Sequence, residues 1–560
     1  MKKPKTITLP TPFAENIGGV PWSEYPRPTL VRESYLSLNG SWELEAEDYR
    51  GPVLVPFSPE SLLSGVGREV GEAYTYRRVF SLPESFVRGR VIIHFGAVDA
   101  EARVLINGGE VGFHEGGYLG FSFDVTEFLR RGENLVEVQV IDTLDTDLPY
   151  GKQRRKRGGM WYTPISGIWQ SVWLESVPDE YVERLEITPS LDSARIRVVG
   201  GAKHKRLTLD GGETIEFDGD EVVVKPSDPE NWTPENPRLH GFTLECGEDE
   251  VRSYFALRTV ETKGNRILLN GKPYFFHGLL DQGYFSDGIY TPATPEGYEF
   301  DIVKMKELGF NMLRKHIKIE PELFYYYCDK HGMVVFQDFV NSGKYNFLVD
   351  TALPTLGLKR GISHHASKRR RQRFESDGLA TLARLYNHPS VCYYTIFNEG
   401  WGQYDADRIY RVMKNADGSR IFDATSGWFF EKESDVDSHH VYFKPIRLKS
   451  GERPLVLSEF GGYSCKIEGH SFNLTQNYGY KYFESAADFE NALCRLYLDE
   501  VVPAVKNGLC AAVLTQVSDV EDETNGLVTY DRRVVKVSTE KMKAIRAAID
   551  RQERMGGFIN

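Results

Sequence analysis

A single residue separates each of two glutamates from an apolar run whose length and composition are typical of buried strands. Glu399 follows the run 391–397, and Glu459 follows the run 455–457. A charged group at the end of a buried strand is costly unless it is paired or has a chemical role. Two carboxylates that face each other can cleave a glycosidic bond, because one donates a proton and the other attacks the anomeric carbon. At about 5–5.5 Å between the carboxyl groups, the configuration is retained.

The chain from residue 263 onward alternates between strand-like and helix-like segments. We expect strands at 274–280, 311–315, 333–339, 391–397, 420–425, 438–442, 454–459 and 510–516, with helices near 296–308, 321–331, 367–386, 405–416, 486–506 and 539–552. Eight such strands predict a (β/α)8 TIM barrel, whose active site lies at the C-terminal strand ends. Glu399 and Glu459 then close strands four and seven. We expect the helices of the fifth and sixth units to be short or absent.

The N-terminal part of the chain reads as β-structure only. Short alternating strands separated by turn residues over about 30–177 predict a β-sandwich. A second β segment, 178–262, has the length of a small immunoglobulin-like β-sandwich. The predicted multidomain chain therefore comprises residues 1–177, 178–262 and 263–560.

The charge balance bears on partners. A net charge of −12 argues against nucleic acid or an anionic membrane as the main partner. Two basic runs, 152–157 and 368–373, are interpreted as solvated surface. A subunit contact in a homo-oligomer, or a patch for an anionic ligand, stays open for both runs.

The cysteines and the first residues bear on cofactors and compartment. The six cysteines are scattered without a CxxC pair, so we expect no metal cluster, no disulfide framework and no cofactor. The basic start 1–6 is not followed by the apolar core of a secretory signal, and the sequence has no run of about 18 apolar residues. We therefore expect a cytoplasmic protein without a membrane span.

Several motifs together resemble glycoside hydrolase family 2, which contains β-galactosidases, β-glucuronidases and β-mannosidases. The motifs are Asn398-Glu399, Ser458-Glu459-Phe460-Gly461, Gly40-Ser41-Trp42, Tyr74 to Arg78, and the segment Met160 to Glu175, which is similar to the family's jelly-roll signature. The resemblance implies a jelly roll, an immunoglobulin-like sandwich and a barrel, in that order. It also implies a retaining double displacement with Glu399 as acid/base and Glu459 as nucleophile. Glu399 must begin protonated and Glu459 ionised.

Further candidates for contacts with a sugar stand at the strand ends. These are Asn398, which the resemblance assigns to the sugar 2-hydroxyl, Asp281 after strand one, Arg314 and His316 after strand two, His440 and Tyr442 at strand six, Trp401 after Glu399, Trp428 after strand five, and Gln516 and Glu521 after strand eight. Structural alternatives stay open, since Asp281 could cap a helix, Arg314 could form a barrel-wall ion pair, and both tryptophans could be core. The adjacent pair His439-His440 would point to opposite faces of a strand, which argues against a metal site.

Departures from the family pattern bear on the sugar. The family's glucuronidases carry an Asn-x-Lys element after strand eight, where this chain has Glu523-Thr524-Asn525. Many members have a histidine at the position of Ile317, although Lys315 or Lys318 could instead bind an anionic substituent. We expect an oligosaccharide or glycoside substrate and a retaining exo-β-glycosidase, with β-galactosidase favoured. The alternatives are a β-glucuronidase or another family 2 activity, and a carbohydrate-binding protein on the same scaffold.

Overall fold

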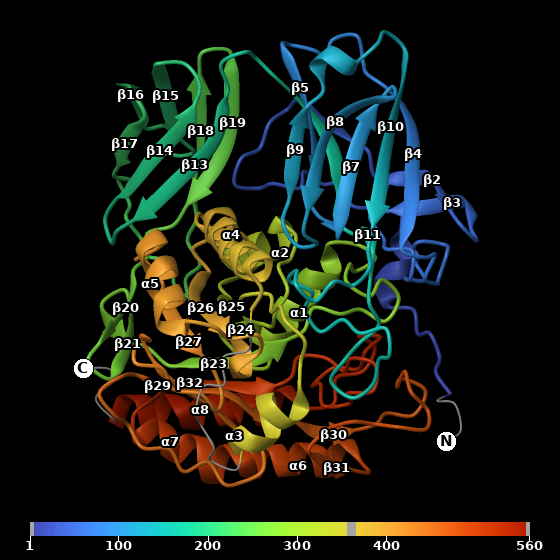
Figure 1. Cartoon of the computed structure of the whole chain (residues 1–560). Helices are drawn as coiled ribbons and strands as arrows, with labels where there is room; N and C mark the ends of the chain where they lie inside the picture. The colour runs from blue at the N-terminus through green and yellow to red at the C-terminus, as the bar shows by residue number, and fades with distance from the viewer. Residues whose placement is uncertain (1–4, 356–365, 556–560) are drawn as a thin grey trace.

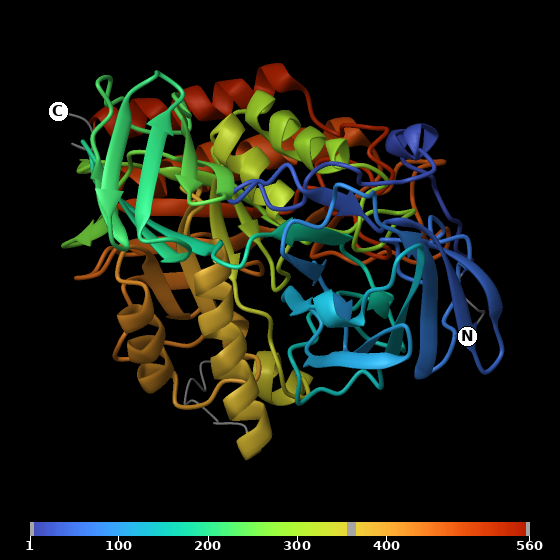
Figure 2. The ribbon, with the colours of Figure 1, turned by 90° about the horizontal axis from the view of Figure 1, so that it is seen from above.

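The computed structural model of the chain describes residues 5–355 and 366–555. Two β-sandwiches lie beside each other above a barrel, which confirms the predicted multidomain fold (Figure 1). Seen from above, in Figure 2, the two sandwiches cover different parts of the barrel. The domain limits drawn from the sequence stay a prediction; the strands of the first sandwich end at Val177, and the first strand before the barrel begins at Val260.

The first sandwich packs a six-stranded antiparallel sheet, in the order β3-β2-β4-β10-β7-β8, with a four-stranded sheet, β1-β12-β5-β9. The strands are β1 (Tyr35–Ser37), β2 (Gly40–Ala46), β3 (Arg50–Val55), β4 (Ala73–Ser81), β5 (Arg90–Phe95), β6 (Val98–Asp99), β7 (Glu101–Ile106), β8 (Gly109–Glu115), β9 (Phe121–Asp124), β10 (Glu133–Ile141), β11 (Gly167–Ile168) and β12 (Val172–Val177), with the short helices η1 (Pro12–Asn16) and η2 (Thr126–Phe128). Along β10 the alternate residues Val136, Val138 and Val140 are buried. This alternation is the pattern of a strand with one face on the core.

The second sandwich is smaller and packs two antiparallel sheets, β13-β14-β17 and β16-β15-β18-β19. Its strands are β13 (Val182–Pro189), β14 (Ala194–Gly200), β15 (His204–Leu209), β16 (Thr214–Asp218), β17 (Glu221–Val224), β18 (His240–Cys246) and β19 (Asp249–Phe255). Trp232, between β17 and β18, is fully buried, and its indole donates a hydrogen bond of 2.8 Å to the carbonyl of Asp329 in the barrel. This tryptophan therefore fixes the sandwich to the barrel.

All eight predicted barrel strands are present, in one sheet of the order β27-β26-β25-β24-β23-β32-β29-β28. They are β23 (Phe276–Asp281), β24 (Met312–Lys315), β25 (Val334–Asp338), β26 (Val391–Phe397), β27 (Ile421–Thr425), β28 (Asp437–Val441), β29 (Leu455–Gly461) and β32 (Leu509–Thr515). The helices are α1 (Glu296–Glu307), α2 (Glu322–His331), η3 (Leu348–Ala352), α3 (Leu353–Thr355), α4 (Lys368–Leu385), η4 (Asn398–Gly400), α5 (Ala406–Ala416), α6 (Ala486–Leu496), η5 (Tyr497–Val501), α7 (Val502–Lys506) and α8 (Thr539–Met555). The pair β30 (Tyr463–Cys465) and β31 (Lys481–Phe483) extends the loop after β29.

The barrel core lies in two layers. Alternate strand residues, among them Phe276, Met312, Phe336 and Tyr393, fill the lumen. The small sheet of β20 (Val260–Lys263), β21 (Arg266–Leu269) and β22 (Lys272–Pro273) adds Val260 and Ile267 to the same cluster. The remaining strand residues pack against the helices. The apolar filling leaves the C-terminal strand ends as the place for polar side chains.

The barrel has irregular fifth and sixth units, as the sequence predicts. Residues 426–436 and 442–454 contain no helix, and β27 and β28 are not hydrogen-bonded neighbours in the sheet. Short loops therefore follow β27 and β28 on the side where Glu399 and Glu459 lie.

The segment before β1 does not pack into the first sandwich alone. Its early part crosses to the barrel, where Thr11 donates two hydrogen bonds, of 2.6 and 2.7 Å, to Asp287. Further along, the guanidinium of Arg32 is 4% exposed and bonds Glu175 of the first sandwich at 3.0 Å and Asp249 of the second at 2.8 Å. This buried cation therefore ties the two sandwiches together.

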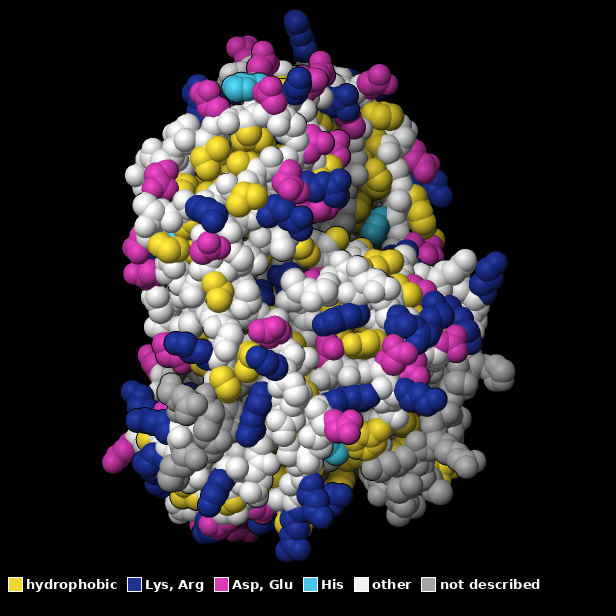
Figure 3. All heavy atoms as spheres, turned by 90° about the vertical axis from the view of Figure 1, so that its left-hand side faces the viewer, with side chains coloured by type: hydrophobic (Ala, Val, Ile, Leu, Met, Phe, Trp, Pro, Cys, Tyr) yellow, Lys and Arg dark blue, Asp and Glu magenta, His cyan; other side chains and the backbone are white. Residues whose placement is uncertain are grey.

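The basic run 368–373 opens α4 and is held in ion pairs. Arg369 bonds Glu115 and Asp145 of the first sandwich, and Arg371 bonds Asp405. On the face shown in Figure 3, Lys and Arg side chains are interspersed with Asp and Glu rather than gathered in a field of one sign. In the part of the chain that the structure describes, no helix is both long and apolar enough to cross a membrane.

The Arg32 network gives a stability test. Arg32→Met leaves the buried carboxylate of Asp249 without its ion-pair partner and leaves Glu175 with Arg27 as its remaining arginine, so we expect a loss of about 3–5 kcal/mol in the free energy of unfolding. Urea unfolding followed by circular dichroism measures the change. Arg50→Met is the matched control, because Arg50 pairs with Glu43 on the exposed surface and such pairs are worth about 1 kcal/mol or less. Equal unfolding midpoints for both variants would contradict the role given to Arg32.

Candidate active site

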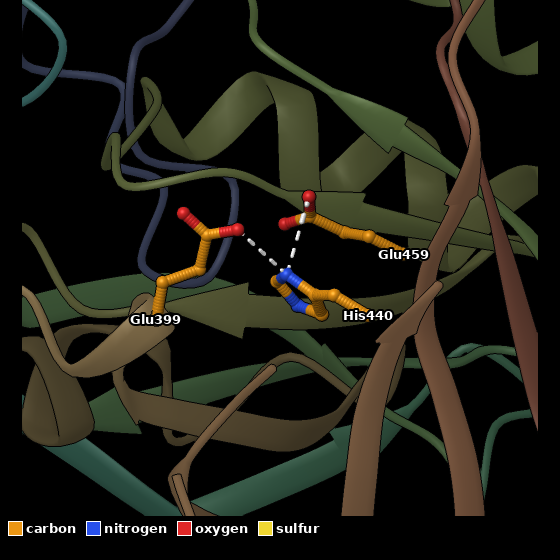
Figure 4. Close-up of side chains that lie close together, drawn as sticks. All are labelled: Glu399, His440 and Glu459. Atoms are coloured by element: carbon orange, nitrogen blue, oxygen red, sulfur yellow. Dashed lines mark hydrogen bonds and ion pairs between the residues drawn. The ribbon is translucent and has the colours of Figure 1, made fainter. Parts of the chain in front are cut away.

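Glu399 and Glu459 meet at the C-terminal mouth of the barrel. Each presents a carboxylate oxygen to Nδ1 of His440, at 2.9 Å for Glu399 and 3.5 Å for Glu459 (Figure 4). An oxygen of one glutamate lies within 4.8 Å of an oxygen of the other. Both side chains are buried. This spacing suits a nucleophile and a proton donor acting on opposite sides of one bond, and it leaves less room for an intervening water.

Glu399 stands on a backbone that few side chains adopt. Its φ of 50° lies in the left-handed region, inside the short turn η4 that ends β26. A non-glycine residue there costs of order 1 kcal/mol or more unless the surroundings fix it. The following residue, Gly400, also has a positive φ, and a Cβ there would lie 2.5 Å from the ring of Phe429, so both the backbone and the space favour glycine. The turn aims the Glu399 carboxylate across the mouth toward His440.

Arg314, at the end of β24, connects the catalytic strand ends. Its guanidinium is 1% exposed and donates to Glu459 at 3.0 Å, to Asp338 at 2.9 Å and to the side-chain oxygen of Asn398 at 2.9 Å. It also donates to the carbonyl of Ser458 at 2.9 Å. One planar cation thus orients groups from β25, β26 and β29, which a lysine could not do with the same geometry.

His440 lies between the two glutamates. Its Nε2 is 3.4 Å from an Arg314 nitrogen, which can only donate. In the neutral imidazole the proton then lies on Nδ1, which donates to Glu399 at 2.9 Å. The second carboxylate oxygen of Glu399 points away from His440 in Figure 4, so it is free for another partner.

The surroundings of Glu459 keep it ionised. Burial alone would raise the pKa of its carboxyl, but the neighbouring His440 and Arg314, together with a 2.6 Å hydrogen bond from Tyr442, lower the pKa to about 2. Arg314 is the permanent charge among these neighbours. His316 adds little charge near neutral pH, because burial lowers its own pKa to about 4. Glu459 is therefore a carboxylate over the whole physiological range.

A small cavity lies over these groups. It is lined by Lys152, Met160, Leu280, Gln282, His316, Asn398, Glu399, Trp401, Tyr442, Glu459, Tyr480, Thr515 and Glu523. Six of the residues singled out from the sequence are among them: His316, Asn398, Glu399, Trp401, Tyr442 and Glu459. Arg314 and His440 do not line the cavity, but Arg314 contacts the carboxylate of Glu459 and His440 contacts that of Glu399. The barrel and the jelly-roll domain both contribute to this lining.

The other predicted site residues lie outside the lining. Asp281 forms an ion pair of 2.7 Å with Lys315. Glu521 accepts from the backbone nitrogen of Thr163 at 2.9 Å. Gln516 donates a hydrogen bond of 2.9 Å to Glu523, which lines the cavity. The ring of Trp428 packs edge-on against the ring of His440, with 5.5 Å between their centres.

Lys315 and Lys318 do not reach the cavity. Lys315 pairs with Asp281 and Glu320, and Lys318 pairs with Glu320 and donates to two carbonyls. Both side chains are at most 1% exposed. The sequence hypothesis that they bind an anionic substituent is therefore wrong, because both charges are already neutralised inside the barrel wall.

Asp338, Glu523 and Lys152 are among the residues of the site that were missed from the sequence. Asp338 ends the buried strand β25 and accepts from His316 at 2.7 Å, and the signal for it was the same strand-end carboxylate that marks Glu459. Glu523 lines the cavity in place of Glu521. Lys152 is buried, which corrects the surface interpretation of the first basic run, although Arg154, Arg155 and Lys156 are exposed. In the sequence, Gln153 separates Lys152 from the other basic residues of the run, and this was a local sign that Lys152 has different surroundings.

Glu399, His440 and Glu459 are also the described residues that could together hold a metal ion. The guanidinium of Arg314 already approaches His440 and Glu459, and its charge opposes a cation at the same place. The absence of a metal remains an expectation from the sequence.

The fold and the paired carboxylates define a multidomain barrel protein of the kind that acts on glycosides. Residues 21–178 match the family model described as glycosyl hydrolases family 2, sugar binding domain, and residues 260–547 match the family's TIM barrel domain. The chain belongs to glycoside hydrolase family 2.

The chain is similar to proteins with different names in this family. A β-galactosidase of Aeromonas hydrophila subsp. hydrophila is 28% identical over 452 residues, which cover 70% of this chain and 42% of that protein. A putative β-glucuronidase of Formosa agariphila is 24% identical over 440 residues, which cover 68% of this chain and 49% of the other. The chain thus spans less than half the length of these relatives.

Solved structures resemble the whole chain. A β-D-glucuronidase of Dictyoglomus thermophilum has a TM-score of 0.74 at 18% identity, with 95% of this chain and 98% of that one covered. A β-galacturonidase of Eisenbergiella tayi, bound to galacturonate, has a TM-score of 0.69 at 18% identity, with 94% and 98% covered. At this identity the likeness establishes the fold alone.

The charge balance around Glu459 gives a pH test. Arg314→Gln removes the permanent cation and leaves burial opposed only by groups such as His440 and Tyr442, so the pKa of Glu459 rises above about 2. Because Glu459 must be ionised to react, kcat/KM falls as the pH drops through that pKa, and the acid limb moves to higher pH by more than one unit. The limb is measured between pH 3 and 8 on whichever p-nitrophenyl glycoside the protein hydrolyses. Tyr442→Phe, which keeps Arg314, should shift it less, and an unmoved limb in Arg314→Gln would contradict the assignment.

Proposed function

We propose that the protein is a retaining exo-β-glycosidase that removes a terminal β-linked sugar by double displacement. The observation that carries the proposal is the pair Glu399 and Glu459, whose carboxylate oxygens approach within 4.8 Å while Arg314 and Tyr442 stabilise the charge of Glu459. A carbohydrate-binding protein would need neither the ionised Glu459 nor the facing Glu399.

In the first step, Glu459 attacks the anomeric carbon and the bond to the leaving oxygen breaks. Glu399 donates its proton to that oxygen from the carboxylate oxygen that His440 does not occupy. The positive charge that develops on the sugar ring is stabilised by Glu459 until the covalent ester forms. The ester removes the negative charge next to Arg314.

In the second step, Glu399 is a carboxylate and takes a proton from water, whose oxygen attacks the anomeric carbon from the side that the leaving group vacated. The ester bond to Glu459 breaks and Glu459 becomes a carboxylate again. Two inversions retain the configuration. The side-chain oxygen of Asn398 accepts from Arg314 and Ser426, so its amide nitrogen is the group left to donate to the sugar 2-hydroxyl.

The exo mode is supported by the enclosure of the cavity. Lys152 and Met160 from the jelly-roll domain, and Tyr480 and Glu523 from barrel loops, stand around the carboxylates. Walls on these sides favour a terminal sugar ring over the interior of a chain.

Two sugars have support. A neutral hexoside, with a β-galactoside first, is favoured by Glu523, whose carboxylate can accept sugar hydroxyls. A β-uronide is favoured by the cation of Lys152 in the same cavity. A panel of p-nitrophenyl β-glycosides, comprising galactoside, glucoside, glucuronide, galacturonide, xyloside and mannoside, distinguishes them.

The nucleophile assignment is tested by Glu459→Ala. Removing the attacking carboxylate should lower kcat by about 10⁴-fold or more with the circular dichroism spectrum unchanged. With wild-type protein, a 2-deoxy-2-fluoro glycosyl fluoride of the best sugar should add one sugar mass to the peptide that holds Glu459. Glu468→Ala, an exposed glutamate, is the control. Near-normal turnover in Glu459→Ala would sink the assignment.

The acid/base assignment is tested by Glu399→Ala with leaving groups of different acidity. Without a proton donor, alkyl glycosides should lose about 10²–10⁴-fold in kcat/KM, whereas 2,4-dinitrophenyl glycosides should lose far less, because their phenolate departs without a proton. Added azide should restore turnover and give the β-glycosyl azide. An equal loss on both substrates, without azide rescue, would argue against the acid role.

A further inference from the structure

The jelly-roll domain delivers one cation to the catalytic cavity. Lys152 is 7% exposed and lines the cavity together with Glu399, Glu459 and Glu523. Its ammonium lies 5.7 Å from the ring centre of Tyr162 and 5.9 Å from that of Trp401. The faces of the two rings attract the ammonium and limit where it can go, but they do not neutralise its charge.

The backbone that carries Lys152 is anchored on both sides. Gln153 donates to Asp99 of the jelly roll at 3.0 Å, and the backbone nitrogen of Tyr150 donates to the carbonyl of Asn341 in the barrel at 3.0 Å. Between them Gly151 has a φ of 70°, and a Cβ there would lie 2.5 Å from the hydroxyl of Tyr118. Lys152 is therefore held at the mouth by contacts with both domains.

Every acid in the cavity already has a donor of its own. Glu459 accepts from Arg314 and Tyr442, and Glu399 accepts from His440. Glu523 accepts from Tyr162 at 2.7 Å and from Gln516 at 2.9 Å. None of these carboxylates depends on Lys152 for its hydrogen bonds.

The ammonium of Lys152 differs from these carboxylates in its hydrogen bonding. Over residues 5–355 and 366–555, no carboxylate oxygen lies within 4.0 Å of its ammonium and no hydrogen bond is formed by it. Lys315 and Lys318, in the same barrel, each have an acid within 3.0 Å. The ammonium lacks a direct acceptor but retains access to the cavity, so a molecule bound there can supply an anionic oxygen to it.

We propose that Lys152 is a specificity-determining residue that binds an anionic substituent of the terminal sugar. The inference rests on the proposed glycosidase function, because it places that sugar between Glu399 and Glu459. The shared chemistry is a group with anionic oxygens, either the carboxylate of a uronide or a sulfate ester. Glu523, more than 4.0 Å from the ammonium, remains free to accept a sugar hydroxyl. The jelly roll, rather than the segment after strand eight, then selects the sugar.

The test compares substrates that differ in one group. The p-nitrophenyl β-glucuronide and β-galacturonide are measured against the neutral β-glucoside and β-galactoside, and the β-galactoside 6-sulfate separates a sulfate from a carboxylate. In Lys152→Met, the ratio of kcat/KM on the preferred anionic substrate to kcat/KM on its neutral counterpart should fall on the order of 100-fold. Lys152→Arg should keep most of the ratio. Lys156→Met removes an exposed charge from the same run and should leave the ratio unchanged.

Binding provides a readout that needs no turnover. By calorimetry, wild-type protein should bind galacturonate or galactose 6-sulfate more tightly than galactose, and Lys152→Met should lose that preference. Tighter binding of galactose by the wild type, or an unchanged ratio in Lys152→Met, would overturn the proposal even if β-glycosides are hydrolysed. Selective anion binding that depends on Lys152, without any hydrolysis, would support the proposal and count against the glycosidase function instead.

Discussion

The geometry of the site depends on the ion pairs and hydrogen bonds that the Arg314 guanidinium makes. Transferring a charged group into a barrel interior costs several kcal/mol, and the cost is offset only when the partners have good geometry. Here two carboxylates, an amide and a carbonyl come from strands that are far apart in sequence. If any of these strand ends shifted, a buried charge would lose a partner. The arrangement of the catalytic strands is thus enforced electrostatically.

The same cation divides the work of the two glutamates. Glu459 lies on Arg314 and stays ionised, whereas Glu399 stands on a separate turn and meets only the imidazole of His440. The charge of Glu459 is thereby fixed by its surroundings. Lys152 adds a third kind of charge, one that the protein positions but leaves without an acid within ion-pair distance among the described residues.

The sequence predicted the barrel and the two glutamates, because buried strands ending in a carboxylate are a local signal and strand order determines which ends meet. It could not decide which of two neighbouring polar residues faces the cavity. Asp281 is the register partner of Lys315 and pairs with it, so Gln282 lines the cavity instead. Likewise Glu523, two positions beyond Glu521, reaches the site. Such choices depend on partners from other segments, which no local pattern contains.

The segment before β1, which crosses to the barrel, has a consequence for the order in which the chain folds. The backbone nitrogen of Ile7 donates to the carbonyl of Phe472, and the backbone nitrogen of Leu474 donates to the carbonyl of Lys5. Two hydrogen bonds therefore hold this early segment to a loop late in the barrel sequence. During synthesis, residues 5–11 leave the ribosome long before their binding surface exists. The sandwiches can fold as they emerge, but residues 5–11 can dock only after the barrel has closed. The docking of this segment therefore follows closure of the barrel, and a protease that cuts near Thr11 would distinguish chains with an unclosed barrel from chains with a closed one.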